Sequence, residues 1–585
     1  MPAESPELVS KQNQMETLAR AAFRDLTAAE RTLVRAACTP EVAYPGQDVG
    51  LARCSLEYRT REASGSLPIP KPGFAQYLLE YMKKAVPSSF PEFSETGSPG
   101  NAVKKWDESR NIRGEVIRWL SVDSKAKALV DPTGIQLFGA RITGQIDLSY
   151  VNVPFRISLK RCRVGAPALF VNSQIPELDL EGSWTGPINL DGAHIKHNLN
   201  LRFGFMANGT VRLVGAVVEG MLSCGESSFI GGDSEAINAD LITVGGAILL
   251  RAGTAYKGKG EPTPFRAEGA VRLLGARVGS DVDCDGGQFH HPSTDPDEAA
   301  LNLERAEVKG ALILRAYSYS NAKPVLPFQA DGLVNLQGAS VASLEDDRAA
   351  WDRPQWSTRL KLDGFVYKGI KEINGIPCKK SDRDCPGDAD VRLLWLQRDI
   401  SSATQPYRQL AKVLQDAGDT AGAKQVLKRM ESIISAGRDS WATQWAKAMI
   451  GYGYEPENAV VLTSVVIALG WILYRRSLLS IVPSDDDAAE SLKSGNGLPP
   501  NYPRFSPLFY SLENTFPLVT LGQCAKWQAD AAPGPALPQD PAGRRFLAWI
   551  TSPPFIRVFM WIQILLGWLL ATFFLAAVSG LVQHN

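Results

Sequence analysis

Residues 135–148 read Ile135-Gln-Leu137-Phe-Gly139-Ala140-Arg-Ile142-Thr-Gly144-Gln-Ile146-Asp-Leu148, and this stretch decides the fold. Clear copies of it occur at 188–201, 211–220 and 271–279, and weaker copies begin near Ile157, Leu178, Ile237, Leu301 and Val334. Apolar residues occupy mostly every second position, which is the alternation of a strand with one buried face. A Gly-Ala pair lies between two short strands, where glycine permits the backbone angles of a corner.

Copies of one stretch separated by variable spacers are typical of stacked structural units. The copies begin about 20 to 34 residues apart, which is within the range of known solenoid periods. The sequence therefore predicts that the middle of the chain is a β-helix. Two longer spacers, 256–262 and 291–296, contain Pro, Gly or Asp and are expected to form loops on one face of it.

The parts of the chain on either side of this region have helical signals. Thr27 and Glu30 form a capping pattern, and Asn111 is expected to cap an amphipathic helix that ends near Leu120. We predict four regions, listed here in chain order: an N-terminal helical region and cap at 1–130, the β-helix at 131–375, a linker and helical hairpin at 376–450, and a membrane region at 451–585. The hairpin is expected at 405–430, with its turn at Gly418.

Two segments near the C-terminus have the composition of transmembrane helices. The first is 459–474, which has no charged residue and is strongly apolar, and the second is 558–582. Trp471 and Tyr474 fit the aromatic belt at a membrane surface. No hydrophobic signal segment opens the chain, so we expect a multi-pass protein whose β-helix lies in the cytoplasm.

A shorter apolar segment, 505–523, lies between the two predicted spans. It resembles the pore helix and the start of the filter in two-span tetrameric cation channels. The filter pattern Thr-Val-Gly-Tyr-Gly is replaced here by Thr520-Leu-Gly522-Gln523-Cys524, so potassium selectivity is not expected. The candidate pore-lining residues are Asn514, Thr520, Gly522 and Gln523. The alternative is an interfacial or re-entrant helix that conducts no ions.

Several segments together resemble a group of bacterial pentapeptide-repeat-like membrane proteins that is loosely labelled "membrane-associated oxidoreductase". The matching segments are 112–120, 131–141, 147–150, the Gly-Ala copies, Pro406-Tyr407, 451–454 and 521–523. This resemblance implies a right-handed β-helix with a C-terminal membrane anchor, and hence a mainly β, pentapeptide-repeat-like solenoid. The implied location is the inner membrane of a bacterium.

The oxidoreductase label has no support in the chemistry of the sequence. No Gly-rich dinucleotide motif follows a strand, and no haem attachment pair or iron–sulfur cysteine run occurs. We therefore expect no cofactor, no metal and no catalytic residue. Cys162, Cys224 and Cys284 are expected to be small core residues. Cys378 and Cys385 flank a polar turn, and they are interpreted as free thiols, as a disulfide or as metal ligands.

Three functions remain open at this point. The first is a membrane-anchored binding or scaffold protein that contacts lipid and an unknown protein partner along the β-helix wall and loops. The second is an oligomeric channel that the β-helix gates as a sensor, in which copies of the chain associate. The third is a redox enzyme. Basic and acidic residues are balanced at 62 each, so nucleic acid is not an expected partner.

Overall fold

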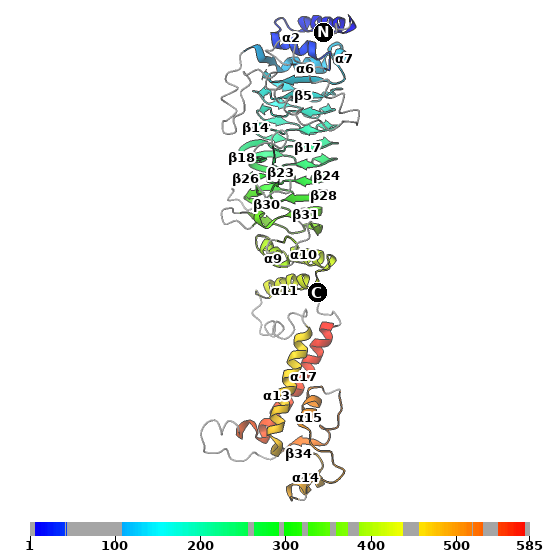
Figure 1. Ribbon diagram of the computed structural model, residues 1–585, viewed down its shortest axis with the longest axis vertical. Helices are drawn as coiled ribbons and strands as arrows, with labels where there is room; N and C mark the ends of the chain where they lie inside the picture. Colours follow the sequence, from blue (N-terminus) through cyan, green and yellow to red (C-terminus); the bar gives the residue numbers. More distant parts are fainter. Residues whose placement is uncertain are drawn as a thin grey trace, which may run out of the picture. The chain divides into compact units, whose positions relative to one another are not determined.

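The computed structural model describes residues 6–40, 42–43, 108–254, 262–291, 298–318, 326–351, 358–371, 385–436, 456–495, 497–516, 519–530 and 548–578. The chain forms two compact units, Met1–Ala423 and Lys424–Asn585 (Figure 1), and each is described by itself. No observation tests the four predicted region boundaries, which stay a prediction.

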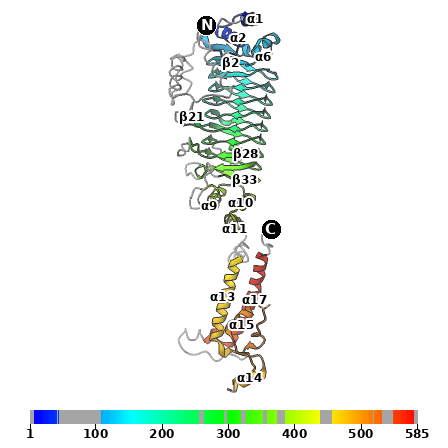
Figure 2. The ribbon, with the colours of Figure 1, turned by 45° about the vertical axis from the view of Figure 1, so that its right-hand side comes forward.

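The first unit begins with helices that lie at one end of its strands (Figure 2). They are α1 (Pro6–Ala22), α2 (Ala28–Ala36), the 3-10 turn η2 (Glu108–Arg110), α6 (Gly114–Val122) and α7 (Ser124–Leu129). The predicted capping box is present, because Thr27 accepts from the Glu30 N–H and Glu30 accepts from the Thr27 N–H. Glu30 is fully buried and also accepts a side-chain hydrogen bond from Arg113 at 2.8 Å.

The predicted helix cap at Asn111 is wrong. Asn111–Arg113 form strand β1, which pairs in parallel with Arg141–Thr143, and α6 starts only at Gly114. Gly114, the first residue of α6, lies against the backbone of a neighbouring turn. A Cβ atom at Gly114 would be 2.3 Å from the carbonyl oxygen of Gln145, so only glycine fits.

The strands of the first unit form two large parallel sheets. The 16-stranded sheet contains β1 (Asn111–Arg113), β3 (Arg141–Thr143), β4 (Ile146–Asp147), β6 (Arg163–Val164), β7 (Ala168–Leu169), β10 (Trp184–Thr185), β11 (Ile188–Asn189), β14 (Met206–Asn208), β15 (Val211–Arg212), β18 (Ser228–Asn238), β23 (Arg266–Arg272), β26 (Gln288–His290), β27 (Ala299–Asn302), β29 (Gln329–Asp331), β30 (Leu333–Asn335) and β32 (Arg359–Lys361). The 15-stranded sheet contains β2 (Ile135–Phe138), β5 (Ile157–Lys160), β8 (Gln174–Ile175), β9 (Leu178–Asp179), β12 (His194–Ile195), β13 (Leu199–Asn200), β16 (Val217–Val218), β17 (Leu222–Ser223), β19 (Thr243–Val244), β20 (Ile248–Leu249), β24 (Arg277–Val278), β25 (Val282–Asp283), β28 (Glu307–Leu314), β31 (Ser340–Asp346) and β33 (Val366–Ile370). We call these two sheets the parallel-sheet region.

The register of the parallel-sheet region aligns equivalent residues of successive copies. Leu178 pairs with Leu199, and Leu199 pairs with Leu222, so one apolar column runs through the buried interior. The alternation in the sequence therefore identifies the buried face correctly. Outside these sheets, β21 (Gly253–Thr254) and β22 (Pro262–Thr263) form a small antiparallel pair.

The predicted fold class, a mainly β, right-handed, pentapeptide-repeat-like β-helix, is corrected by these sheets. The described residues form two large parallel sheets of 16 and 15 strands, accompanied by helices on either side in the chain. The expected fold class was wrong because some strands are longer than the copied stretch predicts. β18 pairs with both β14 and β15, and β28 pairs with both β24 and β25, so strands that the copies alone would leave apart belong to one sheet.

A column of phenylalanine rings runs through the core of the parallel-sheet region. Its members are Phe205, Phe229, Phe265, Phe289 and Phe328, all with at most 1% of their surface exposed, and Trp351 follows them. Successive ring centroids are 5.3–6.0 Å apart and the rings are tilted against each other. This geometry is favourable for aromatic pairs, which adds to the gain from burial.

A second column consists of tight turns in which the backbone is left-handed. Its members, with φ between 49° and 73°, are Tyr150, Asn172, Gly192, Gly215, Leu241, Gly275, Arg305, Gly338 and Gly364. Each turn from Tyr150 to Gly338 donates its N–H to the turn of the next layer, as Gly215 does to the carbonyl of Asp240 at 2.9 Å, whereas the N–H of the last turn, Gly364, donates to the side chain of Gln405. Glycine has no steric penalty at such angles, whereas a leucine does.

Replacing Leu241 by glycine should raise the free energy of unfolding by about 0.5–1 kcal/mol, because the strained φ of 59° is relieved. Leu241 is 61% exposed, so little buried area is lost. The matched control is Gly215→Leu in the same column. A Cβ at Gly215 would meet no atom within 4 Å, so its expected loss of about 1–2 kcal/mol reports the backbone angle alone. Chemical unfolding followed by circular dichroism measures the stability of both variants. If Leu241→Gly and Gly215→Leu were each as stable as the wild-type protein, the prediction would be contradicted.

Helices follow the last strands of the first unit. They are the 3-10 turn η3 (Arg348–Ala350), α9 (Ala389–Leu396), α10 (Gln405–Asp416) and α11 (Thr420–Ala436). α10 and α11 cover the segment where the hairpin is predicted, with Gly418 at a φ of 86° between them, and the packing of these two helices on each other stays a prediction. α10 lies against the final strand: Gln405 accepts from the Gly364 N–H and donates to the carbonyl of Phe365, and Gln409 donates to the carbonyl of Tyr367.

Candidate functional site in the C-terminal unit

The second unit is built on two long helices with a shorter one against both. These are α13 (Pro456–Arg476), α17 (Pro553–Val578) and α15 (Pro507–Thr515) (Figure 1). The 3-10 turn η6 (Leu478–Ser480), α14 (Asp486–Lys493) and the antiparallel pair β34 (Ile481–Pro483) and β35 (Trp527–Ala529) complete it. The predicted opening at Ser506-Pro507 is where α15 begins.

Two glycines allow α15 to approach the long helices closely. A Cβ at Gly470 of α13 would be 2.3 Å from Oγ of Ser511, and a Cβ at Gly567 of α17 would be 2.0 Å from the carbonyl oxygen of Thr515. Because neither position has room for a larger residue, α15 is held between α13 and α17 with little freedom to move.

Gln563 joins all three helices through hydrogen bonds, although it is only 1% exposed. Its Nε2 donates to Oγ of Ser511 and to Oγ1 of Thr515, both at 2.9 Å, and its Oε1 accepts from the Tyr474 hydroxyl at 2.7 Å. Ser511 in turn donates to the carbonyl of Ile467 in α13 at 2.8 Å. These groups satisfy one another away from water, so the network fixes the position of α15.

Glu513 holds the chain that returns after α15. Its Oε2 accepts from the backbone N–H groups of Gln523 at 2.7 Å and of Cys524 at 2.9 Å. The side chain of Gln523 accepts from the Ser506 N–H at 2.9 Å, which ties the end of this segment to its beginning. These hydrogen bonds tie Gln523 and Cys524 to α15 and to Ser506 just before it.

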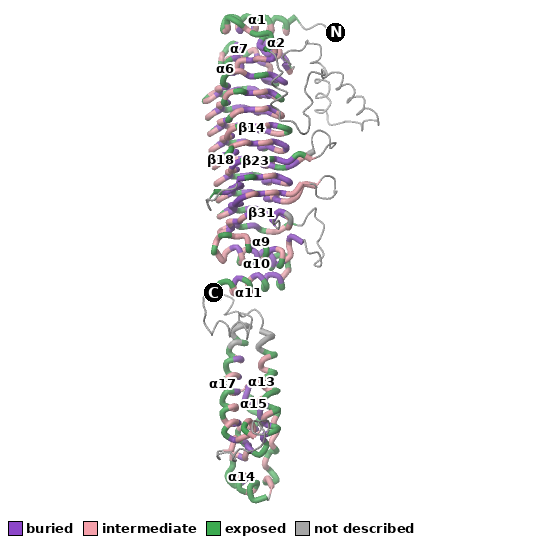
Figure 3. Tube along the Cα trace, turned by 90° about the vertical axis from the view of Figure 1, so that its left-hand side faces the viewer, coloured by how far each residue is buried: buried purple, intermediate pink, exposed green. Residues whose placement is uncertain are grey.

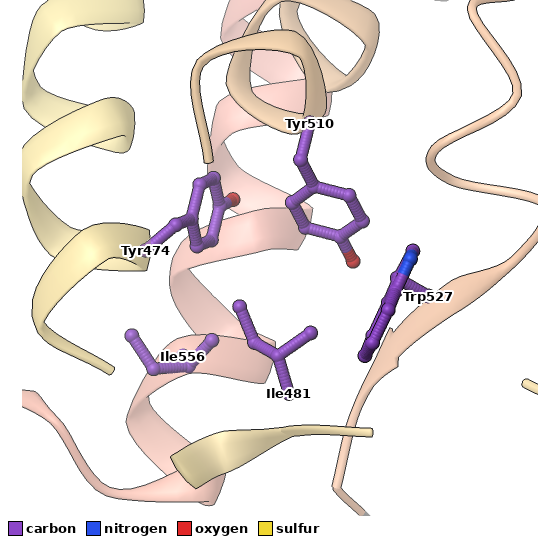
Figure 4. Close-up of a cluster of buried hydrophobic side chains, with 5 residues drawn as sticks. All are labelled: Tyr474, Ile481, Tyr510, Trp527 and Ile556. Carbon is purple, nitrogen blue, oxygen red and sulfur yellow. The ribbon is translucent and has the colours of Figure 1, made fainter. Parts of the chain in front are cut away.

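An aromatic cluster packs beneath this segment. Figure 4 shows Tyr474, Ile481, Tyr510, Trp527 and Ile556 converging from all parts of the unit, and each is buried. The rings of Tyr474 and Tyr510 meet edge to face with centroids 4.9 Å apart. The cluster fixes the base of α15 against both long helices.

Many residues of both long helices are exposed and drawn green in Figure 3, and a large share of them are apolar. Those on α17 are Val558, Trp561, Ile562, Leu565, Trp568, Leu569, Phe574 and Leu575, and those on α13 are Val460, Val461, Val465, Leu469, Trp471 and Ile472. Within the described residues, one helix, Pro553–Thr572, is long and apolar enough to cross a membrane. The multi-pass arrangement with a second span at 459–474 stays a prediction.

The four predicted pore-lining residues separate into two pairs. Asn514 and Gln523 are buried, and the Asn514 amide donates to the carbonyl of Tyr510 at 2.9 Å. Thr520 and Gly522 are exposed. No observation tests whether any of them lines a pore. Of the predicted disulfide pair, Cys385 is buried, and Cys378 lies outside the described residues.

Sequence reasoning overlooked the residues that hold the site together, which are Gln563, Ser511, Thr515 and Glu513. Gln563 had a recognisable signal, since it is a lone amide inside an apolar helix, where a polar side chain needs a partner. The roles of Ser511 and Thr515 depend on where α15 meets α17, and their spacing alone does not reveal this.

In the parallel-sheet region, arginines pair with buried or partly buried acidic residues of neighbouring layers. Arg251 pairs with Asp283 at 3.2 Å, and Arg315 pairs with Asp285 at 3.1 Å and with Glu345 at 3.1 Å. Burial and the neighbouring Asp283 carboxylate raise the pKa of Asp285 to about 7, against the attraction of Arg315. Among the described residues, no group of three or more His, Cys, Asp or Glu side chains is placed to hold a metal ion.

The raised pKa of Asp285 predicts that the contribution of this residue to the free energy of unfolding falls as the pH rises from about 4 to about 7. In this window the folded state keeps a proton that the unfolded aspartate releases, so rising pH favours unfolding by up to about 1.4 kcal/mol per pH unit. Asp285→Asn should reduce the fall in the free energy of unfolding with rising pH. Asp191→Asn, which changes a different ion pair, should leave this fall as it is in the wild-type protein. Denaturant unfolding at several pH values measures the slope, and equal slopes in all three proteins would contradict this assignment.

No protein-family model matches this chain, and no curated protein or solved structure matches it either.

Proposed function

We propose that this chain is a membrane-anchored binding protein of the bacterial inner membrane. In this proposal the C-terminal unit lies in the lipid bilayer and the parallel-sheet region binds a protein partner. The observation that supports it most is the set of uncovered apolar side chains on α17, which have no favourable place in water. A helix of this length and composition gains free energy when lipid surrounds it.

The partner surface is proposed from the column of left-handed turns. Tyr150 is 77% exposed and Leu241 is 61% exposed, and both occupy backbone angles that disfavour them. Side chains kept at strained positions are a reason to look for a function, because glycine would be more stable there. Exposed aromatic and aliphatic side chains are the usual anchors of protein interfaces.

Membrane insertion is tested by flotation and alkaline extraction of the full-length protein. Leu565→Lys places a charge on an exposed position of α17 and should reduce insertion, because a lysine near the helix centre costs about 2.5–3.5 kcal/mol. The matched control is Leu479→Lys, since Leu479 is 97% exposed but lies in the short turn after α13. Recovery of the wild-type protein in the soluble fraction would contradict membrane anchoring.

Partner binding is tested by chemical crosslinking in native membranes, with mass spectrometry of the products. The double variant Tyr150→Gly, Leu241→Gly should lose crosslinks from the parallel-sheet region, while Arg305→Gly in the same column should keep them. Glycine suits these backbone angles, so a loss reflects binding rather than unfolding. Wild-type protein without any crosslinked partner, or a double variant with unchanged crosslinks, would count against the proposal.

A further inference from the structure

Charged side chains alternate in sign along one column beside the 15-stranded sheet, which we call the charge column. Each member lies just before a turn, and a backbone hydrogen bond links it to the turn of the layer before, as from the Gly182 N–H to the carbonyl of Arg202 at 3.0 Å. The members, in chain order, are Lys160, Glu181, Arg202, Gly225, Arg251, Asp285 and Arg315. A glycine therefore occupies the one position where the alternation calls for an acid.

Arg315 shows how an arginine is paired where the alternation is complete. Its guanidinium lies 3.1 Å from Asp285 in one neighbouring layer and 3.1 Å from Glu345 in the other. A planar guanidinium has donors on several sides, so carboxylates on both sides use it well.

Arg202 and Arg251 have an ion-pair partner on one side only, among the residues that the structure describes. Arg202 is 3.9 Å from Glu181 in the preceding layer, and Arg251 is 3.2 Å from Asp283 in the following layer. Between the two arginines lies the layer of Gly225, which has no side chain. Nε of Arg202 is buried and has no hydrogen-bond partner in this part of the chain. The column thus lacks an anion between two cations.

The backbone does not require glycine at position 225. Its φ is outside the left-handed region, and a Cβ atom there would make an ordinary contact of 3.4 Å with the carbonyl oxygen of Arg251. An aspartate would therefore fit at this position, and its absence leaves the space between the two arginines open.

Glu226 is next in the chain but does not supply the missing anion. Within the described residues its carboxylate forms no ion pair with Arg202 or Arg251, and its side chain is buried against Gly253. Burial raises the pKa of Glu226, against the attraction of the two arginines. In its neutral form a carboxyl group donates a hydrogen bond to an oxyanion instead of repelling it.

The two arginines are accessible to a ligand from solvent, since their side chains are 37% and 47% exposed. Two layers of a parallel sheet separate Cα atoms by about 10 Å, a distance that two long side chains bridge when both bind one group. Guanidinium groups match the oxygens of carboxylates and phosphates.

From this arrangement we infer that Arg202 and Arg251 bind a small-molecule oxyanion, a carboxylate or a phosphate, in the layer of Gly225. The inference goes beyond membrane anchoring. It depends neither on insertion of the C-terminal unit nor on the protein partner proposed above.

Isothermal titration of the full-length protein in detergent tests the inference. Inorganic phosphate and acetate are used as separate probes, in chloride buffer of constant ionic strength. We expect saturable binding of at least one probe, and the comparison identifies the preferred acid group. Wild-type protein that binds neither probe would overturn the inference.

Arginine variants locate the site. Arg202→Gln and Arg251→Gln should each weaken binding about tenfold, because each removes hydrogen bonds to a charged group. The matched control is Arg212→Gln, which removes a similarly exposed arginine from the other sheet and should leave the affinity unchanged. Equal weakening in all three variants would mean that overall charge holds the anion, and would overturn the assignment.

Gly225→Asp supplies the missing carboxylate from the chain itself. It should abolish binding of the probe, because its carboxylate occupies the space between the two arginines. Without any probe it should unfold at a higher temperature than Gly225→Asn, which fills the same space without a charge. Retained binding in Gly225→Asp, or equal unfolding temperatures of the two variants, would show that the layer does not need an anion.

Discussion

Replacing Asp346 by alanine should lower the free energy of unfolding by about 3–5 kcal/mol. Asp346 and Arg392 are each only 2% exposed, and the guanidinium donates to both carboxylate oxygens, at 2.9 and 2.5 Å. The indole N–H of Trp351 donates to the same carboxylate at 2.7 Å. The variant would leave the Arg392 charge buried without its counter-charge, and this accounts for most of the loss.

A double-mutant cycle separates the ion pair from the packing around it. Asp346→Leu combined with Arg392→Met removes both charges and should cost clearly less than the sum of the two single variants. Lys371 provides a surface control, since its side chain is 63% exposed and Glu345, with which it pairs, keeps Arg315 as a second partner, so Lys371→Ala should change stability by less than about 1 kcal/mol. Chemical unfolding of the full-length protein in detergent measures all of them. Additive losses would show that Asp346 and Arg392 do not act as a pair.

Phe265→Ala should also lower the free energy of unfolding by about 3–5 kcal/mol. Phe265 is fully buried in the middle of the phenylalanine column, with ring centroids 5.5 Å from Phe229 and 5.3 Å from Phe289. The alanine would leave a cavity between two rings that the parallel strands hold in place, so the neighbours have little scope to close it.

Two variants distinguish this cavity from a general effect of losing a phenylalanine. Phe265→Leu keeps most of the volume and should cost considerably less. Phe203→Ala removes an exposed ring at a left-handed turn and should change stability little. The denaturation midpoints give the comparison, and equal losses at Phe203 and Phe265 would contradict a role for the column.

The sequence allowed the buried face of the strands to be predicted, but not how the strands join. Alternation places Ile135, Leu137 and Ile146 inside, and all three are buried. The extent of pairing depends on neighbours that are 20 or more residues away in the chain, so nothing near β18 in the sequence indicates that it pairs with both β14 and β15. Asn111 shows the same limit, because its good local capping chemistry is overridden by strand pairing with Arg141.

The short helix within 505–523 could be predicted from the sequence, but its contacts with the long helices could not. The Ser-Pro opening and the apolar run marked 505–523 as a short re-entrant element, and α15 occupies part of it. The predicted pore-lining residues rested only on their position in this segment, so they include both the buried Asn514 and the exposed Thr520. The contact between Gln563 and Ser511 joins residues 52 positions apart, and only the packing of three helices shows it.

The glutamines of α10 have a consequence for the solubility of the whole molecule. The outer strand of a parallel sheet offers free N–H and C=O groups, which are a template for another chain and can start a fibre. Gln409 occupies such a group at Tyr367 of the outer strand β33, and Gln405 binds Gly364 and Phe365 in the turn before that strand, each with a side-chain amide that carries the same donor and acceptor as a peptide bond. Because α10 packs against β33 and occupies its Tyr367 carbonyl, a strand of another chain could not pair along the full length of β33, and this would hinder end-to-end polymerisation of the 15-stranded sheet.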